Sequence, residues 1–161
     1  MTKTRIQEVD LQHRPYTHPS RAKINWRFDQ ALKAIANEDL RFAEEILRQL
    51  VEGSKESKLF IALARVHSLQ GQFDKAEFIL QSAVLLDSTK IVQLTLAMAQ
   101  VKLDLLKFDH ARELLLELQN RDQQGIIDLT HDEATLLMNC NARLTHRVRN
   151  YSLYKEIIKN K

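Results

Sequence analysis

The chain repeats one pattern of small and large apolar residues at intervals of 33 and 35 residues, anchored on Ala43, Ala76 and Ala111. In every block a large apolar residue stands three positions before the anchor, a leucine stands four positions after it and a further apolar residue stands seven positions after it. These three sets are Leu40, Phe73 and Phe108; Leu47, Leu80 and Leu115; and Leu50, Ala83 and Leu118. Such offsets lie on one face of an α-helix. The pattern therefore predicts one buried helix face in each of three similar units.

A second alanine stands twelve positions before each anchor, at Ala31, Ala64 and Ala99. It falls on a preceding helix, and two small residues allow the two helices to approach closely as an antiparallel hairpin. One short hairpin buries too little apolar surface by itself, so successive hairpins have to stack. The chain holds only three glycines and two prolines, and both prolines lie in the first twenty residues. We expect helices at 23–36, 39–52, 56–69, 73–86, 89–105, 108–120, 131–145 and 148–160.

The middle block resembles the tetratricopeptide repeat (TPR) family, whose period is about 34 residues. Phe60, Leu63, Ala64 and His67 stand at the aromatic, leucine, small and tyrosine positions of the family's first helix, and Gly71 stands at the turn glycine. Glu38 and Leu106 replace that glycine in the outer blocks. The resemblance implies an all-α fold, a right-handed superhelix of stacked antiparallel helix hairpins (a TPR-like α-solenoid).

The expected organisation has three parts. Residues 1–20 form an extended N-terminal tail, 21–124 form three TPR-like hairpins, and 125–161 form a C-terminal capping hairpin of two helices. The run from Thr130 to Glu133 has the residue types of a capping box, which marks the start of the seventh helix.

The sequence predicts no enzyme. It has no phosphate-binding glycine loop, no paired histidines of a zinc protease and no CxxC motif. The single cysteine, Cys140, lies near apolar positions of a predicted helix, and we expect it in the core. We expect no metal, no cofactor and no small-molecule substrate. We also expect a cytoplasmic location, because the first residues lack the apolar region of a signal peptide and no apolar run is long enough to span a bilayer.

The resemblance implies that the first helix of each hairpin lines a concave groove. Counting from Ala31, Ala64 and Ala99 places nine side chains there, with an apolar stripe and a polar edge suited to a peptide or an amphipathic helix of another protein. They are Asn25, Phe28, Leu32, Lys58, Ile61, Arg65, Gln93, Leu96 and Gln100. Phe28, Ile61 and Leu96 could equally be core residues between helices. The co-chaperone subfamily that clamps a carboxylate with basic and amide side chains is not matched, because those groove positions hold Phe28, Leu32, Gln93 and Ala97.

The leading functional hypothesis is therefore an adaptor or scaffold for another protein, or a chaperone similar to the bacterial secretion chaperones of translocator proteins. A TPR output module of a larger signalling protein is compatible with the same residues, and so is a homodimer. The other class is nucleic-acid binding through basic ends, because residues 141–161 carry six Lys or Arg residues against Glu156. Arg143, Arg147 and Arg149 are the candidate basic contacts.

Overall fold

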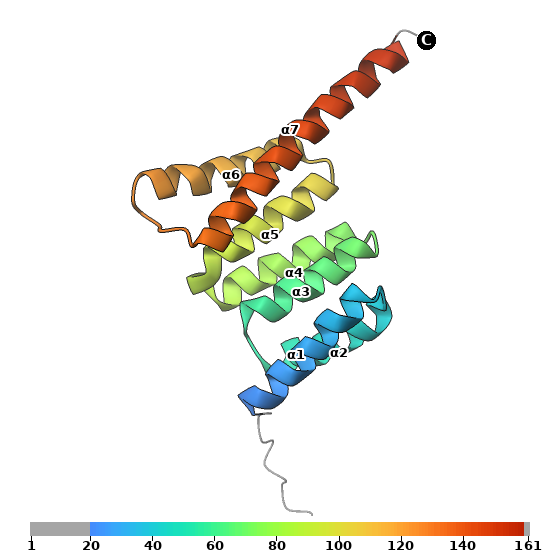
Figure 1. Ribbon diagram of the computed structural model, residues 1–161, viewed down its shortest axis with the longest axis vertical. Helices are drawn as coiled ribbons and strands as arrows, with labels where there is room; N and C mark the ends of the chain where they lie inside the picture. The colour runs from blue at the N-terminus through green and yellow to red at the C-terminus, as the bar shows by residue number, and fades with distance from the viewer. Residues whose placement is uncertain (1–19, 160–161) are drawn as a thin grey trace, which may run out of the picture.

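The computed structural model describes residues 20–159, which form seven α-helices, one short 3-10 helix and no strand. The elements are α1 (Arg21–Ala36), α2 (Leu40–Gly53), α3 (Ser57–Leu69), α4 (Phe73–Leu86), η1 (Ser88–Lys90), α5 (Ile91–Asp104), α6 (Phe108–Gln123) and α7 (His131–Lys159). The pairs α1–α2, α3–α4 and α5–α6 form hairpins that stack in chain order, and α7 packs on α5 and α6 at the end of the stack (Figure 1). The all-helical fold of stacked hairpins predicted from the repeat is confirmed.

The six helices of the three hairpins begin and end within three residues of the predicted bounds. The fifth begins with the 3-10 turn η1, where the Asp87 carboxylate accepts a hydrogen bond of 3.0 Å from the backbone N–H of Thr89. The predicted N-terminal tail lies outside the described residues except for Ser20, whose hydroxyl accepts a hydrogen bond from the Lys23 N–H and caps α1.

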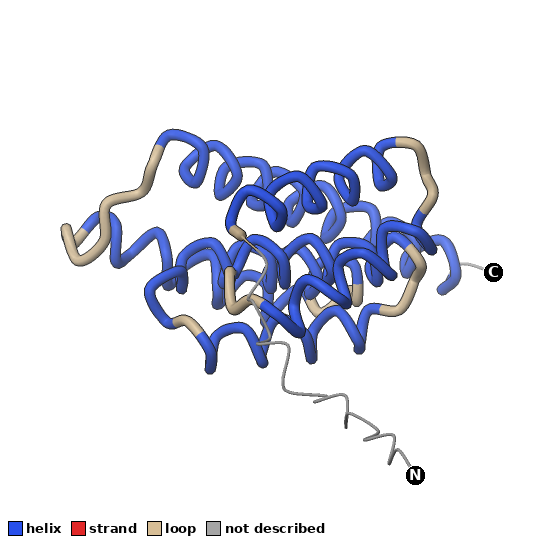
Figure 2. The backbone as a smooth tube through the Cα atoms, turned by 90° about the horizontal axis from the view of Figure 1, so that it is seen from below, coloured by secondary structure: helices blue, strands red, loops and turns tan. Residues whose placement is uncertain are grey.

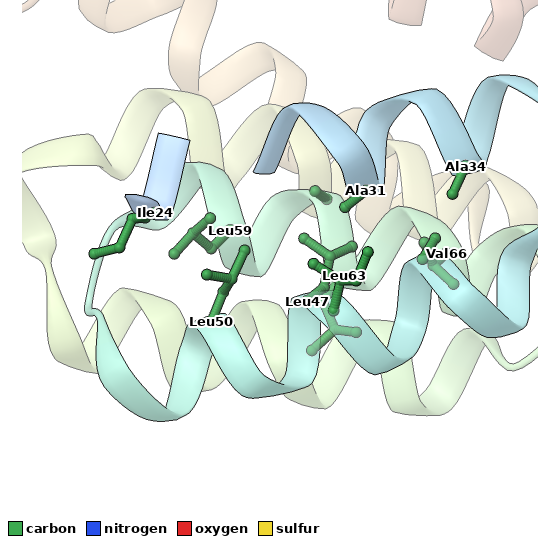
Figure 3. Packing of buried hydrophobic residues seen from close by; sticks show 11 residues of the cluster. Ile24, Ala31, Ala34, Leu47, Leu50, Leu59, Leu63 and Val66 are labelled. Atoms are coloured by element: carbon green, nitrogen blue, oxygen red, sulfur yellow. The ribbon is translucent and has the colours of Figure 1, made fainter. Parts of the chain in front are cut away.

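The repeated residues form the core. Ala43, Ala76 and Ala111 have no exposed surface, and Leu47 and Leu80 are likewise fully buried. Their partners on the preceding helices, the alanines at 31, 64 and 99, are at most 1% exposed. Figure 3 shows Ala31, Leu47 and Leu63 packed together between the first hairpin and α3. The helices of each hairpin therefore approach closely at small residues, as the pattern predicts.

The same turn closes all three hairpins. Glu38, Gly71 and Leu106 have φ angles of 62°, 75° and 59°, in the left-handed region. After each of them, the next backbone N–H bonds a carbonyl five residues earlier, from Asp39 to Ala34, from Gln72 to His67 and from Lys107 to Lys102. This pattern is the Schellman motif, which favours glycine at the left-handed position. Glu38 and Leu106 thus adopt the conformation of the glycine they replace.

The C-terminal hairpin predicted at 131–145 and 148–160 is wrong, because His131–Lys159 forms one continuous helix. Its start is the predicted capping box, in which the Thr130 N–H donates to Glu133 Oε2 over 3.0 Å and the Glu133 N–H donates to Thr130 Oγ1 over 3.3 Å. No glycine or proline follows to end it. Val148 still packs on the core, as predicted. The Tyr151 ring contacts the Phe108 ring edge-on, with 5.9 Å between the ring centres. The last turns of α7 extend beyond the other helices (Figure 1).

Candidate functional site

The helices α1, α3, α5 and α7 contact one another in order and form one layer, against which α2, α4 and α6 pack as the second helices of their hairpins. Figure 2 shows the helices arranged in two layers. The side of the first layer that faces away from α2, α4 and α6 is called the groove face. The predicted binding residues come from α1, α3 and α5, so they belong to this layer.

An open hollow of about 700 Å³ lies on the groove face between α3, α5 and α7. Its floor reaches through the layer to Phe73 and Leu80 of α4. The walls combine apolar side chains with a few polar groups, namely Ile61, Ala64, Arg65, Ser68, Leu69, Ala97, Gln100, Val101, Asp104, Leu136 and Arg143. A mainly apolar hollow with a few convergent polar groups has the composition of a ligand site.

Three of the predicted groove residues meet in this hollow: Ile61 and Arg65 from α3, and Gln100 from α5. Ile61 is half-buried and packs against the core of the middle repeats. Arg65 is exposed and has no ion pair with any carboxylate of residues 20–159. The hollow therefore offers an apolar wall beside a cation that no carboxylate of the described residues pairs with.

Lys58 lies in a separate part of the groove face, where it joins α1 to α3. Its Nζ donates a hydrogen bond of 2.9 Å to Asn25 Oδ1 and lies 5.3 Å from the centre of the Phe28 ring. It also pairs with Glu56 at 3.1 Å. Lys58 and Gln93 line a second hollow of about 650 Å³, next to the start of α1. Leu32 is 41% exposed and lines neither hollow.

The assignment of Leu96 to the groove surface is wrong. Leu96 has no exposed surface and packs among the residues that join α5 to α6 and α7. Phe28 and Ile61 hold the same repeat position but stay half-buried. The difference arises because α7 packs closely on α5 and covers the third copy of the position.

The three candidate basic residues differ in their contacts. Arg143 and Arg147 lie on one face of α7, and their guanidinium groups are 2.9 Å and 3.6 Å from the same Asp104 oxygen. Arg147 also donates a hydrogen bond of 3.2 Å to the carbonyl of Leu103. Arg149 is exposed. Two of the three cations therefore serve to fix α7 on α5, and Arg143 lines the hollow at the same time.

Sequence reasoning missed Leu69, Asp104 and Leu136 as lining residues. Leu136 reaches the hollow only because α7 folds back on α5, and no repeat offset predicts that contact. Leu69 and Asp104 stand in the last turns of α3 and α5, beyond the positions that the repeat anchors define.

In the described part of the chain, the groups with a shifted pKa, namely Glu77, Asp87 and Cys140, do not line the hollow. Cys140 has no exposed surface and lies in the core, as predicted. Burial raises the pKa of its thiol, so the thiol stays protonated. Hydrogen bonds from Thr89 lower the pKa of Asp87, whose carboxylate caps η1. Within residues 20–159, no three His, Cys, Asp or Glu side chains are grouped to hold a metal ion. Among these residues no helix combines the length and the apolar character needed to cross a membrane.

No protein-family model and no curated protein matches the sequence. Solved structures do match the fold. The Yersinia enterocolitica type III secretion chaperone SycD, solved with a peptide of the translocator YopD, is 16% identical with a TM-score of 0.63, over 81% of this chain and 97% of that one. The Sgt2 TPR domain from Aspergillus fumigatus is 14% identical with a TM-score of 0.60, over 84% and 87% of the two chains.

These similarities define the class of the fold. The chain has the fold of TPR domains, an all-helical fold of stacked hairpins, over most of its length. The three hairpins followed by α7 are the part of the molecule that carries the groove.

Proposed function

We propose that this protein is a non-enzymatic binding module that holds a peptide or amphipathic helix of another protein in its groove face. The observation that carries the proposal is the hollow between α3, α5 and α7, where Ile61 and Leu69 stand beside Arg65, which pairs with no carboxylate of residues 20–159. The SycD structure supports the same mode of use, because that chaperone was solved with a peptide of its translocator.

The lining selects the chemistry of the ligand. The half-buried Phe73, with Ile61 and Leu69 on the walls, takes an apolar side chain, whose burial provides most of the binding free energy. Arg65 and Gln100 stand on the walls as a donor-rich pair, so an acidic side chain next to the apolar anchor gains a charge-assisted hydrogen bond. We therefore expect an adaptor or chaperone whose partner segment combines one large apolar residue with a neighbouring carboxylate.

Peptide selection tests this function. A random peptide library is selected on the wild-type protein, and the affinity of each selected peptide is then measured by fluorescence anisotropy. We expect selected peptides to share the apolar and acidic pair, and Arg65→Glu to weaken their binding at least about tenfold. The control is Arg112→Glu, which reverses a cation of α6 that is paired with Asp109.

Two results would contradict the proposal. One is a set of selected peptides that bind wild type and Arg65→Glu equally. The other is a protein that selects no peptide but binds single-stranded RNA with a strong salt dependence, which would favour the basic ends as the functional surface.

A further inference from the structure

A hollow of about 740 Å³ lies between α2 and α4, on the side of α3 away from the groove face. It is here called the outer hollow, and it is lined by Arg48, Val51, Glu52, Leu63, His67, Asp74, Lys75, Phe78 and Ile79. None of these residues lines either hollow of the groove face. A ligand of the groove face therefore leaves the outer hollow free.

The floor of the outer hollow is apolar and its one buried polar group has a partner. Leu63 is 4% exposed, and Val51 and Ile79 are half-buried beside it. The His67 ring is 2% exposed, and its Nδ1 lies 2.9 Å from Gln72 Oε1. Because the imidazole is already hydrogen-bonded, the floor favours an apolar side chain over a polar one.

An aromatic side chain projects at the rim of the same hollow. Phe78 is 69% exposed, and Leu85, two turns further along the same face of α4, is 88% exposed. Aromatic side chains with large exposed areas next to a pocket are typical of interaction surfaces. The face thus carries both a projecting apolar group and a cavity able to receive one.

The charges around the outer hollow are balanced. Arg48 and Lys75 stand against Glu52 and Asp74, so the rim has equal numbers of cations and carboxylates. A rim of this kind gives no net attraction to a strongly acidic or basic partner. It does suit a second copy of itself, since a two-fold axis can bring opposite charges together.

We propose that two copies of this chain pack through the outer hollow, with Phe78 of each copy seated in the outer hollow of the other. A two-fold axis requires a projection and its receptor on one patch, and both are present here. The dimer presents two groove faces outward, so that one partner chain carrying two binding segments is held with increased avidity. The dimer itself does not depend on the proposed peptide function.

Sedimentation velocity over a range of concentrations tests the dimer. We expect the full chain to reach twice its mass of 18.8 kDa as its concentration rises. Phe78→Asp should raise the dimer dissociation constant at least about thirtyfold, as expected for a central aromatic anchor. The matched control is Met138→Asp, which places the same charge on a 72% exposed residue of α7 and should leave the dimer intact. Circular dichroism establishes that both variants are folded.

Lys75→Glu provides a second variant that removes no apolar contact. It leaves three carboxylates against Arg48 on each copy, so the dimer should weaken at low salt and recover as salt screens the repulsion. A wild-type chain that stays monomeric at every concentration overturns the proposal. So does a folded Phe78→Asp protein that dimerises like wild type, since another surface must then form the dimer.

Discussion

Arg143 and Asp104 form an ion pair of 2.9 Å that joins α7 to the end of α5. Arg147, one turn later, lies 3.6 Å from the same carboxylate oxygen. Asp104 is the more buried partner, with 24% of its side chain exposed. The Asp104 carboxylate thus fixes α7, the helix that covers Leu96 and forms one wall of the hollow between α3, α5 and α7.

Removing this carboxylate should loosen α7. We expect Asp104→Asn to lower the free energy of unfolding by about 1 kcal/mol, because two partly exposed pairs are lost together. For a chain of this length that corresponds to a thermal midpoint about 2–4 °C lower. Glu117→Gln is the control, since Glu117 is 63% exposed and Arg121 is its one ion-pair partner among residues 20–159. Equal midpoints for the two variants, measured by circular dichroism, would show that the ion pair does not hold α7.

Glu77 gives the stability a specific pH dependence. A hydrogen bond from Lys102 is the main cause that lowers the pKa of Glu77, and the charge of Lys107 adds to it. The folded pKa lies below the unfolded one, so this stabilisation is present above the ordinary glutamate value of about 4.3 and is lost as the pH falls through the folded pKa. The difference between the thermal unfolding midpoints of wild type and Glu77→Gln, measured by circular dichroism, should therefore be largest near neutral pH and decrease at acid pH. A difference that stays constant from pH 7 to pH 3 would contradict this account.

The left-handed turns predict a stabilising substitution. Leu106 has φ 59° and is 54% exposed, so its backbone is strained and its side chain makes few packing contacts. The left-handed backbone conformation costs an L-residue about 1–2 kcal/mol, and glycine removes that cost. Part of the gain in stability is lost, because glycine also increases the conformational entropy of the unfolded chain. We expect Leu106→Gly to raise the free energy of unfolding by up to about 1 kcal/mol in urea unfolding. Gly71→Ala, at φ 75°, should have the opposite sign.

The close approach of helices predicts an unfavourable enlargement. Ala64 is 1% exposed and packs with Ala76 and Leu80 of the neighbouring helix. Overpacking such a site costs about 1–3 kcal/mol, so Ala64→Leu should lower the urea midpoint clearly. Ala142→Leu is the control, because Ala142 is exposed on α7. A core that tolerates both changes equally would mean that the alanine does not set the helix spacing.

The sequence predicted those features that depend on residues close together in the chain. They are the buried anchor alanines of the repeat and the capping box at Thr130. The shared turn at Glu38 and Leu106 was not predicted, because these residues replace the glycine that the turn favours. The end of the molecule does not follow from the repeat, because no fourth block exists and α7 continues where a hairpin was expected. Leu96 shows the consequence. Its repeat position matches that of Ile61, but its burial depends on α7, more than thirty residues further along the chain.

That difference gives the last prediction. Leu96 has no exposed surface, so a carboxylate there would be buried without a partner, and Leu96→Asp should unfold the protein. Ile61 is half-buried in the lining of the hollow between α3, α5 and α7, where an introduced carboxylate stays in contact with water close to Arg65. Ile61→Asp should therefore unfold cooperatively with a reduced midpoint and lose affinity for the selected peptides. Circular dichroism checks whether each of the two variants is folded, and fluorescence anisotropy measures their affinity for the selected peptides. If Ile61→Asp is folded and binds those peptides as wild type does, the hollow between α3, α5 and α7 is not the binding site, whereas a folded Leu96→Asp protein would contradict the packing of α7 on α5.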